Sequence, residues 1–387
     1  MDFFLNEDQQ KLQDMVEEFA REEVSPNAEQ RDRDAAFPTE LFLKMSGLGI
    51  PAIPHDPEYG GLGMGTFEMV LAIEQLARVD QSLAVSTMVS TAVALTLSRF
   101  GSVEQKEKWL RPVVAGTKLA SLGGTEPQAG SDTAGFKTRA DQHADGTWTI
   151  NGEKAFITNA GTDISSFTMA IAKAAAYGSD EREFTLFLVP AGTPGFEAGK
   201  SYNKMGWRSS DTRPLHFTDC KVPDDFVVGK VGAGRYITHK GFQQGRAFLG
   251  ACSLGLAQGC LDLSVAYAKE RQAFGASLGK LALIQDMIAQ IAIRVAAARM
   301  LVYRAAWLAD HDKAELKDLA IAKYYATEIG TECANLAVQV HGGWGFMDDC
   351  PVSRYLRDNR VCTIGDGSSQ IQTLLIAREL GLEVEFN

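Results

Sequence analysis

The chain has 387 residues, and its 49 acidic side chains outnumber the 38 Lys and Arg, which gives a formal net charge of −11. With 45% apolar and 22% charged residues the composition is that of an ordinary globular protein. Nucleic-acid binding is not expected of so acidic a chain, because neutralising phosphates requires clustered Lys and Arg. The length accommodates one large unit or two to three packed domains.

The first 122 residues have the periodicity of helices. Apolar residues between Leu5 and Ala20 recur at spacings of three and four, with Glu, Gln and Arg between them. Further helices are expected over residues 39–45, 66–78, 82–100 and 103–114. We therefore expect an N-terminal helical domain over residues 1–122.

Neither export nor a membrane span is expected. Residues 1–15 contain no basic segment followed by an apolar core, so they do not resemble a signal peptide. The apolar stretch 81–98 is interrupted by Ser and Thr, which favours a buried helix. The six cysteines form no CxxC pair, which suits a reducing compartment, so a cytoplasmic protein is expected.

Short alternating runs replace the helical pattern after Lys118. Gly, Asn, Asp and Pro separate these runs, and regularly spaced short strands of this kind predict a β-sandwich or barrel over residues 123–232. The runs are LASLGG, GFKTRADQ, WTING, KAFITN, SFTMAIAKA, EFTLFLV and PLHFTDCKV.

The helical period returns near Gly232, and Pro351 is the only proline beyond that point. Four helices, most of them long, are expected over residues 236–269, 280–310, 314–341 and 367–380. They form a C-terminal helical domain over residues 233–387. The α–β–α order predicts an α+β protein in which helical bundles flank a small β-domain.

Two familiar site motifs can be set aside. GGLGMG (60–65) follows no predicted strand and has no acidic residue about 20 positions later, so it is not a dinucleotide-binding loop. The six histidines have no metal-ligand spacing, so no metal site is expected.

Four other segments carry chemistry. TEPQAGSD (125–132) presents backbone N–H groups and hydroxyls after a strand, which could cradle a phosphate or bond the edge of a heteroaromatic ring, although a simple hairpin turn explains it equally well. NGEKAFITN (151–159) places an aromatic residue and a Thr on a strand. RQAFG (271–275) follows a long helix, and QVHGGWGF (339–346) has glycines where backbone must be approached closely.

In combination these segments resemble the acyl-CoA dehydrogenase family. They correspond to the family's TEPxAGSD, NGxKxWITN, RxxFG and QxxGG. Two more segments, KMGWRSSDT (204–212) and IGDGSSQIQ (364–372), correspond to KxGxRxSxT and IYEGTSEIQ. The six motifs follow the family's order, and the resemblance runs from about residue 4 to residue 382.

The resemblance implies a fold and a reaction. The fold is an N-terminal helical domain, a central β-domain and a C-terminal four-helix bundle, usually in a homotetramer, with FAD between the β-domain and the C-terminal helices. In the reaction a carboxylate removes the α-proton of an acyl-CoA while a hydride leaves Cβ for the flavin. The product is the 2,3-enoyl-CoA, and the electrons pass to electron-transferring flavoprotein.

The resemblance also assigns roles. Thr125 and Thr158 match positions whose hydroxyls bond the flavin ring, and Phe156 matches the aromatic residue that stacks beside it. Arg271, Phe274, Gln339 and Gly343 match the site where one subunit holds the adenosine pyrophosphate of its neighbour's FAD. The other predicted cofactor contacts are Leu122, Gly124, Gly130, Ser131, Ile157, Val340, Gly342, Ser368 and Gln370. The predicted substrate contacts are Ser131, Phe242, Arg246, Gly365 and Gly367, with a backbone N–H of residue 366 or 367 bonding the thioester carbonyl.

The sequence departs from the family at the base. Asp366 stands where the family has Glu, and Gly245 stands where a second group of members carries Glu before the Arg. Asp366 is therefore either the working base or the mark of a catalytically silent homologue. A flavin monooxygenase of the same fold is a third alternative, which the intact RQAFG and QVHGG segments disfavour.

Asp also bears on the substrate. Its carboxylate lies about 1.5 Å, one C–C bond, closer to the backbone than that of Glu would. Gly365 also replaces the Tyr that is common in members that act on straight chains. With the modest Ser86, Met88, Ser90, Thr91 and Val93 on the pocket helix, a wide and short pocket is expected. Cyclohexane-1-carboxyl-CoA is the leading substrate, and a short or 2-methyl-branched acyl-CoA is the alternative. Burial should raise the Asp366 pKa and a nearby Arg246 should lower it. The sequence does not show which of the two effects is larger.

Overall fold

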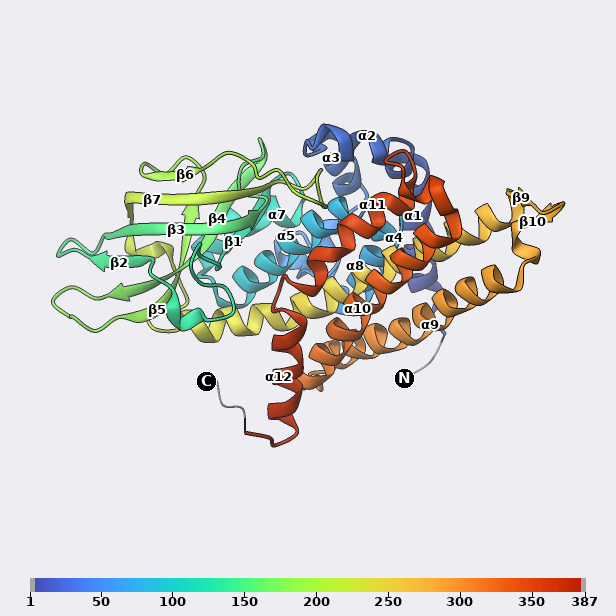
Figure 1. Ribbon diagram of the computed structural model, residues 1–387. Coiled ribbons are helices and arrows are strands. Elements are labelled where there is room, and N and C mark those ends of the chain that lie inside the picture. The colour runs from blue at the N-terminus through green and yellow to red at the C-terminus, as the bar shows by residue number, and fades with distance from the viewer. Residues whose placement is uncertain (1–3, 384–387) are drawn as a thin grey trace.

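The computed structural model describes residues 4–383, and it has the predicted order of helices, sheet and helices (Figure 1). The β-domain lies at one end of the molecule, and the helices fill the rest. The α-helices of the N-terminal part are α1 (Glu7–Phe19), α2 (Ala28–Asp34), α3 (Thr39–Gly47), α4 (Thr66–Ala77), α5 (Gln81–Phe100), α6 (Val103–Gln105) and α7 (Arg111–Val114).

Helix α5 is the central element of the N-terminal part. It begins where the Asp80 side chain accepts hydrogen bonds from the backbone N–H groups of Ser82 and Leu83, at 3.0 and 3.2 Å, and it runs to Phe100 before Gly101. Such an N-cap satisfies two donors that the first turn of a helix cannot pair internally. The predicted helix over 103–114 is interrupted, because a π-helical turn, Lys106–Leu110, separates α6 from α7.

The central strands form one eight-stranded sheet with the order β6-β7-β3-β2-β4-β5-β8, and β1 pairs with β4. Side chains of β4 alternate: Phe167, Met169 and Ile171 pack toward the helices, whereas Ala170 and Ala172 pack inside the β-domain. The strands are β1 (Leu119–Gly123), β2 (Arg139–Gln142), β3 (Trp148–Thr158), β4 (Ser165–Ala175), β5 (Glu183–Pro190), β6 (Phe196–Ala198), β7 (Thr212–Val222) and β8 (Val227–Val228). Two of the predicted runs, WTING and KAFITN, thus belong to the single strand β3.

Helix α8 (Gly234–Glu270) connects the two ends of the molecule. Its 37 residues span about 55 Å, from the β-domain to the small hairpin β9 (Gln272–Ala273) and β10 (Ala276–Ser277). Close packing fixes its place: a Cβ at Gly255 would lie 2.1 Å from the Glu74 carbonyl oxygen of α4. The other helices of this part are α9 (Ala282–Asp310), α10 (Leu316–His341), α11 (Pro351–Asn359) and α12 (Ser369–Glu379).

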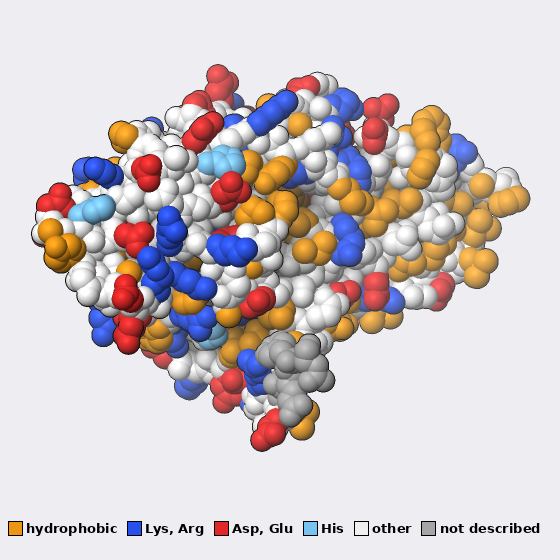
Figure 2. All heavy atoms as spheres, turned by 60° about the vertical axis from the view of Figure 1, so that its left-hand side comes forward, with side chains coloured by type: hydrophobic (Ala, Val, Ile, Leu, Met, Phe, Trp, Pro, Cys, Tyr) orange, Lys and Arg blue, Asp and Glu red, His pale blue; other side chains and the backbone are white. Residues whose placement is uncertain are grey.

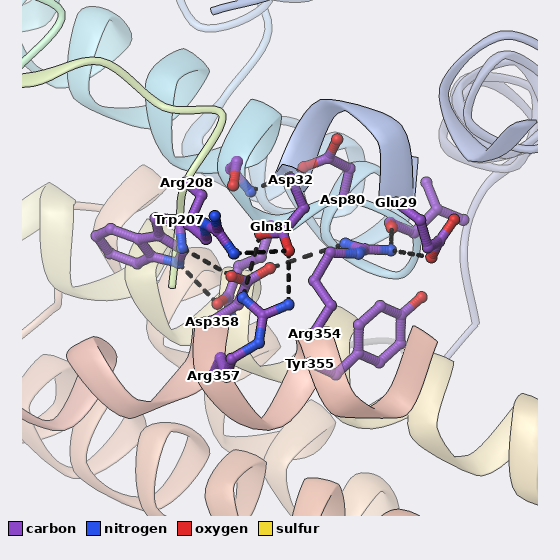
Figure 3. A network of polar contacts seen from close by, with 12 residues as sticks. Glu29, Asp32, Asp80, Gln81, Trp207, Arg208, Arg354, Tyr355, Arg357 and Asp358 are labelled. Carbon is purple, nitrogen blue, oxygen red and sulfur yellow. Dashed lines mark hydrogen bonds and ion pairs between the residues drawn. The ribbon is translucent and has the colours of Figure 1, made fainter. Parts of the chain in front are cut away.

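A buried polar network joins the helical parts to the 204–212 segment (Figure 3). Arg357 of α11 pairs with Asp32 of α2 at 2.5 Å, and the Trp207 backbone N–H donates to Asp358 Oδ1 at 2.7 Å. Arg354 lies 3.7 Å from Asp358, whose burial raises the pKa of its carboxyl to about 7. Buried charges are tolerated because they are paired, so removing one partner would be costly.

Two helices, α5 and α8, are long and apolar enough to cross a membrane by length and composition. However, 67% and 72% of the residues in their apolar windows are buried inside the fold, as in the core helix of a soluble protein. All six cysteines are free thiols, and five of them are buried.

Candidate active site

Asp366 lies in a tight turn between the short helix Arg360–Thr363 and α12. Asp366 and Gly367 both have left-handed backbone conformations, with φ of +52° and +79°. The left-handed backbone favours glycine at position 367, and a Cβ there would also lie 2.8 Å from Gln372 Nε2. Asp tolerates the left-handed conformation better than most residues, so the turn suits this residue at the base position.

The Asp366 carboxylate is half-buried and faces Gly245 of α8. Its Oδ2 would lie 3.8 Å from a Cβ at Gly245. Within residues 4–383 this carboxylate accepts no hydrogen bond, so both oxygens are free to meet a ligand. Burial raises the Asp366 pKa, and the opposing charges of Lys323 and Arg246 do not reverse that shift. This answers the question that the sequence left open.

Three side chains surround this turn from different helices. Lys323 of α10, which is fully buried, donates from Nζ to the Gly367 carbonyl oxygen at 2.9 Å. Gln372 of α12 donates from Nε2 to the carbonyl oxygens of Asp366 and Gly367, at 3.2 and 2.8 Å. Arg246 of α8 is also buried and donates from Nε to Gln372 Oε1 at 3.2 Å.

Sequence reasoning predicted Arg246 but missed Lys323 and Gln372. A signal for Lys323 was available: it falls on the apolar face of α10, one residue after Ala322 and three before Ala326, where a charged residue is unexpected. Gln372 lies within the IGDGSSQIQ motif.

The TEPQAGSD segment forms a four-residue turn after β1, with Glu126 and Ala129 bridged by backbone hydrogen bonds of 2.8 and 3.1 Å. Glu126 is buried and pairs with the fully buried Lys154 of β3 at 2.8 Å. Hydrogen bonds from the backbone N–H groups of Lys137 and Thr138 and from Lys154 hold the Glu126 pKa at about 2, although burial alone would raise it. The buried Glu126–Lys154 pair thus anchors the turn to strand β3 of the sheet.

That anchor brings the predicted flavin contacts together. The Ala155 backbone N–H donates to the Thr125 carbonyl oxygen at 2.9 Å, so the turn lies against β3 beside Phe156 and Thr158. Phe156 lies at a β-bulge with φ of +62°, and its side chain is 65% exposed. The centroids of the Phe156 and Tyr202 rings are 5.3 Å apart. An exposed aromatic residue in a strained backbone conformation is typical of a functional site. Tyr202 was not predicted.

A second group of predicted residues meets at the far end of α8. Arg271, Gln339, Val340, Gly342 and Gly343 line one cavity of about 600 Å³. The rings of Tyr267 and His341, which the sequence did not suggest, are stacked in its lining with centroids 4.3 Å apart. Phe274, the sixth residue of this group, is 92% exposed in the hairpin β9–β10 region.

The remaining predicted residues take the following places. Leu122 is half-buried in β1, Ile157 is buried in β3, and Ser131 is exposed. Ser368 caps α12 and Gln370 is exposed in its first turn, whereas the Phe242 side chain lies outside the described residues. Two residues of the expected pocket lining have their hydroxyls engaged inside the fold: the Ser86 hydroxyl bonds Ser210 at 3.1 Å, and the Ser90 hydroxyl accepts the Ala120 backbone N–H at 3.1 Å.

Comparison with known proteins agrees with this geometry. Family models for the N-terminal, middle and C-terminal domains of acyl-CoA dehydrogenase match residues 6–117, 121–220 and 232–381. The chain belongs to the acyl-CoA dehydrogenase family. It is 39% identical to a probable acyl-CoA dehydrogenase of Bacillus subtilis, over 98% of this chain and 100% of that one. It is 37% identical to the human mitochondrial short-chain specific acyl-CoA dehydrogenase, over 97% of this chain and 90% of that one.

Solved structures give the same result. The butyryl-CoA dehydrogenase of Megasphaera elsdenii has a TM-score of 0.94 at 35% identity, covering 99% of this chain and 100% of that one. A glutaryl-CoA dehydrogenase in complex with glutaryl-CoA has a TM-score of 0.93 at 32% identity, covering 99% of this chain and 98% of that one. The predicted fold class is confirmed, and the chain is an FAD-dependent acyl-CoA dehydrogenase.

The residues present fit FAD. A Cβ at Gly124 would meet no atom within 4 Å, so the surface beside Thr125 and the exposed Phe156 is open to a planar ring. Gly342 and Gly343 are equally open beside Arg271, whose planar guanidinium suits a pyrophosphate. Bound FAD supplies the acceptor for the hydride that leaves the substrate.

Proposed function

We propose that Asp366 is the base that removes the α-proton of the acyl-CoA, and that the preferred substrate carries bulk at its α-carbon. The observation that carries this proposal is the half-buried Asp366 carboxylate, which has no hydrogen bond within residues 4–383 and faces the empty position of Gly245. A base must have its lone pair free and a pKa raised toward that of the proton it accepts. Asp366 meets both conditions, which favours a working base over a silent homologue.

The space around Asp366 supports a wide substrate. Gly365 does not have a positive φ, and a Cβ there would lie 3.6 Å from the nearest atom, the Val361 carbonyl oxygen. A larger side chain would therefore fit at position 365, and its absence leaves room beside the base. A ring or a 2-methyl branch would bring the α-carbon to the shorter Asp side chain. Cyclohexane-1-carboxyl-CoA is the leading candidate, followed by a 2-methyl-branched acyl-CoA.

One stripe of α5 would form the wall of the acyl pocket. Most residues of α5 are buried, but Val89, Ala92 and Leu95, which are three residues apart, stay partly exposed. This spacing puts them on one side of the helix. Their aliphatic side chains and modest size suit an uncharged, compact acyl group, and they replace Ser86 and Ser90 as the proposed lining.

A short straight-chain acyl-CoA is a second candidate. It is favoured by the relatives, because the human enzyme is named short-chain specific and the Megasphaera elsdenii structure is a butyryl-CoA dehydrogenase. The two candidates differ in what must fill the space beside Asp366, so direct comparison of substrates separates them.

The turn that carries Asp366 would also polarise the thioester. Within residues 4–383 the backbone N–H groups of Asp366 and Gly367 have no protein acceptor. Because C=O and N–H point in opposite directions in a trans peptide, the hydrogen bond from Gln372 to the Asp366 carbonyl directs the Gly367 N–H away from Gln372. A donor aimed at the thioester oxygen stabilises the enolate that forms as the proton leaves.

We further propose a homotetramer in which each FAD is shared between subunits. The two groups of predicted cofactor contacts lie near opposite ends of α8, and Arg246 and Glu270 are about 36 Å apart along that helix. The cavity at Arg271 is therefore too far from this chain's own base to hold the same cofactor. The helical end also exposes large apolar side chains, among them Phe274 (92%) and Leu283 (80%), and Figure 2 shows hydrophobic side chains gathered there.

Electron-transferring flavoprotein is the proposed electron acceptor. Membership of the acyl-CoA dehydrogenase family supports it, because the resemblance implies that the electrons pass to this protein.

The test is anaerobic reduction of the bound flavin by three acyl-CoAs: cyclohexane-1-carboxyl-CoA, 2-methylbutyryl-CoA and butyryl-CoA. We expect the fastest bleaching with the cyclic thioester. Asp366→Asn should retain FAD but reduce the flavin about 10²–10⁴-fold more slowly. Asp312→Asn is the matched control, because Asp312 has the same left-handed backbone (φ +53°) on an exposed turn.

Each outcome decides one part of the proposal. Wild-type turnover in Asp366→Asn would refute the base, and fastest bleaching by butyryl-CoA would establish the straight-chain alternative. Asp366→Glu should shift activity from the cyclic toward the straight thioester, because the longer side chain enters the space that a ring occupies. Faster turnover of the cyclic thioester in Asp366→Glu would show that the short base does not select the substrate.

A further inference from the structure

Lys323 is a fully buried lysine behind the base turn. It lies in the first third of α10, between the buried Leu319 and Thr327, and donates to the Gly367 carbonyl oxygen at 2.9 Å. Within residues 4–383 it forms no salt bridge. A buried ammonium without a directly bonded carboxylate is costly, so its retention at this position calls for a physical reason.

Donors from Lys323 and Gln372 converge on the backbone of the turn that carries the base. The Gly367 carbonyl receives two donors, Lys323 Nζ at 2.9 Å and Gln372 Nε2 at 2.8 Å, and Gln372 also holds the Asp366 carbonyl at 3.2 Å. Asp366 and Gly367 are consecutive residues with positive φ, which is a conformation that a chain leaves unless its surroundings hold it. Helices α10 and α12 thus hold this turn through its two carbonyl groups.

We propose that Lys323 is a positioning residue for Asp366: it fixes the Asp366–Gly367 turn through the Gly367 carbonyl and places a positive charge beside the carboxylate that receives the α-proton. The inference rests on the proposed role of Asp366 as the base. Lys323 itself takes no proton from the substrate, because its Nζ is engaged on the backbone side of the turn.

Charged and titratable groups face this site from each neighbouring helix. Asp366 interacts with Lys323 of α10 and Arg246 of α8, both of which lower its pKa against the effect of burial. Lys323 interacts in turn with Asp366, Cys362, Arg246 and Glu328. His239, whose pKa is lowered by burial first and then by Arg246, lies on the same side of α8. Removing the Lys323 charge should therefore raise the Asp366 pKa further, so that less carboxylate is ionised at neutral pH.

The test separates proton removal from hydride transfer. In 2-methyl-3-thiabutyryl-CoA, which keeps the branch at the α-carbon, a sulfur replaces the β-carbon, so the α-proton can be lost but no hydride can pass to the flavin. The deprotonated ligand beside oxidised flavin gives a long-wavelength charge-transfer absorption, and its amplitude against pH reports the apparent pKa of proton removal. FAD content and thermal unfolding are measured on the same samples.

We compare Lys323→Met, which removes both the charge and the donor, with Lys323→Gln, which removes the charge and keeps an N–H donor. Both variants should retain FAD and shift the charge-transfer titration to higher pH. Lys323→Met should also lose about 10-fold or more in the rate of proton removal, because a displaced base is far less effective. Lys317→Met is the control, because Lys317 lies at the start of the same helix and pairs with Glu315.

An unchanged titration and rate in Lys323→Met would overturn the positioning role. Loss of FAD and of thermal stability in both Lys323 variants, but not in Lys317→Met, would show a purely structural lysine and also overturn it. If Asp366→Asn kept the charge-transfer signal, the base assignment would fail instead, and the two failures are therefore distinguishable.

Discussion

Asp366 combines three properties at a single residue: a left-handed backbone, a carboxylate without a hydrogen bond within residues 4–383, and a pKa raised by burial. These properties depend on one another. The conformation projects the side chain toward Gly245, and burial there removes the water that would otherwise stabilise the ionised form. The charges of Lys323 and Arg246 keep the shift from growing larger. The proposed base is therefore tuned by groups from α8, α10 and α12 together.

A second residue with an unusual environment is His55, which is 2% exposed and has no hydrogen-bond partner for either ring nitrogen within the described part of the chain. Burial lowers its pKa to about 4. Below the pKa of an unfolded histidine, about 6.5, the unfolded chain therefore binds a proton that the folded chain does not. The free energy of unfolding is therefore at its full value above about pH 6.5, and it decreases as the pH falls from there toward 4.

We predict that His55→Leu narrows the difference in thermal stability between pH 7.5 and pH 5. At pH 5 the buried His55 lowers the free energy of unfolding by about 2 kcal/mol, on the basis of about 1.4 kcal/mol per pKa unit, and the substitution removes this loss. Scanning calorimetry at the two pH values measures it. His143→Leu, a substitution at an exposed histidine, is the control. An equal pH dependence in wild type and His55→Leu would show that His55 is not buried in its neutral form.

At the scale of elements, the turn after β1 and the strand β3 act as one unit because of the Glu126–Lys154 pair. Both side chains are buried, 2.8 Å apart, and Lys154 also donates to the Gly124 carbonyl oxygen at 3.2 Å. The pair lies between the two segments that carry Thr125 and Thr158. It therefore sets the distance between two proposed flavin contacts without touching the flavin itself.

We predict that Lys154→Met and Glu126→Gln each weaken FAD retention and destabilise the apoprotein. Leaving a buried charge without its partner typically costs about 3–5 kcal/mol. The double variant should be less damaged than the sum of the two singles, because it leaves no unpaired charge. Denaturant unfolding of the apoprotein and FAD titration measure both effects. Strict additivity would mean that the two side chains do not depend on each other.

The same scale shows what a sequence can and cannot predict. The strands were predictable because β4 alternates between two cores, and the long helices because their apolar period is sustained. Helix α11 was missed because its buried residues include Arg354, Asp358 and Asn359, and buried charges look like an exposed surface in a sequence. Lys323 was also missed, although its position among the apolar residues of α10 offered a signal. The motifs identified the base turn, but its positive φ values depend on donors from distant helices.

At the scale of the whole molecule, the length of α8 separates the proposed base from the cavity at Arg271, so the two groups of proposed cofactor contacts lie far apart in one chain. In the proposed tetramer, a second chain would complete the site by bringing its Arg271 end to this chain's flavin end. Exposed apolar residues around that cavity, such as Trp344 at 63% and Phe346 at 81%, would be covered by the same contact. Cofactor binding and assembly should thus be linked, because each FAD stabilises the interface that it bridges.

We therefore predict that Arg271→Ala loosens both FAD and the oligomer. Removing one partner of a buried, charged contact typically costs about 2–5 kcal/mol, which corresponds to FAD binding that is roughly 30- to 4,000-fold weaker. Flavin absorbance per chain and analytical ultracentrifugation, with and without added FAD, measure the two effects. Arg304→Ala is the control, because Arg304 is an exposed arginine of α9 paired with Asp318. Excess FAD should restore the oligomer of Arg271→Ala if the cofactor bridges subunits. Full FAD retention in an Arg271→Ala variant that remains assembled would show that this cavity does not hold the cofactor.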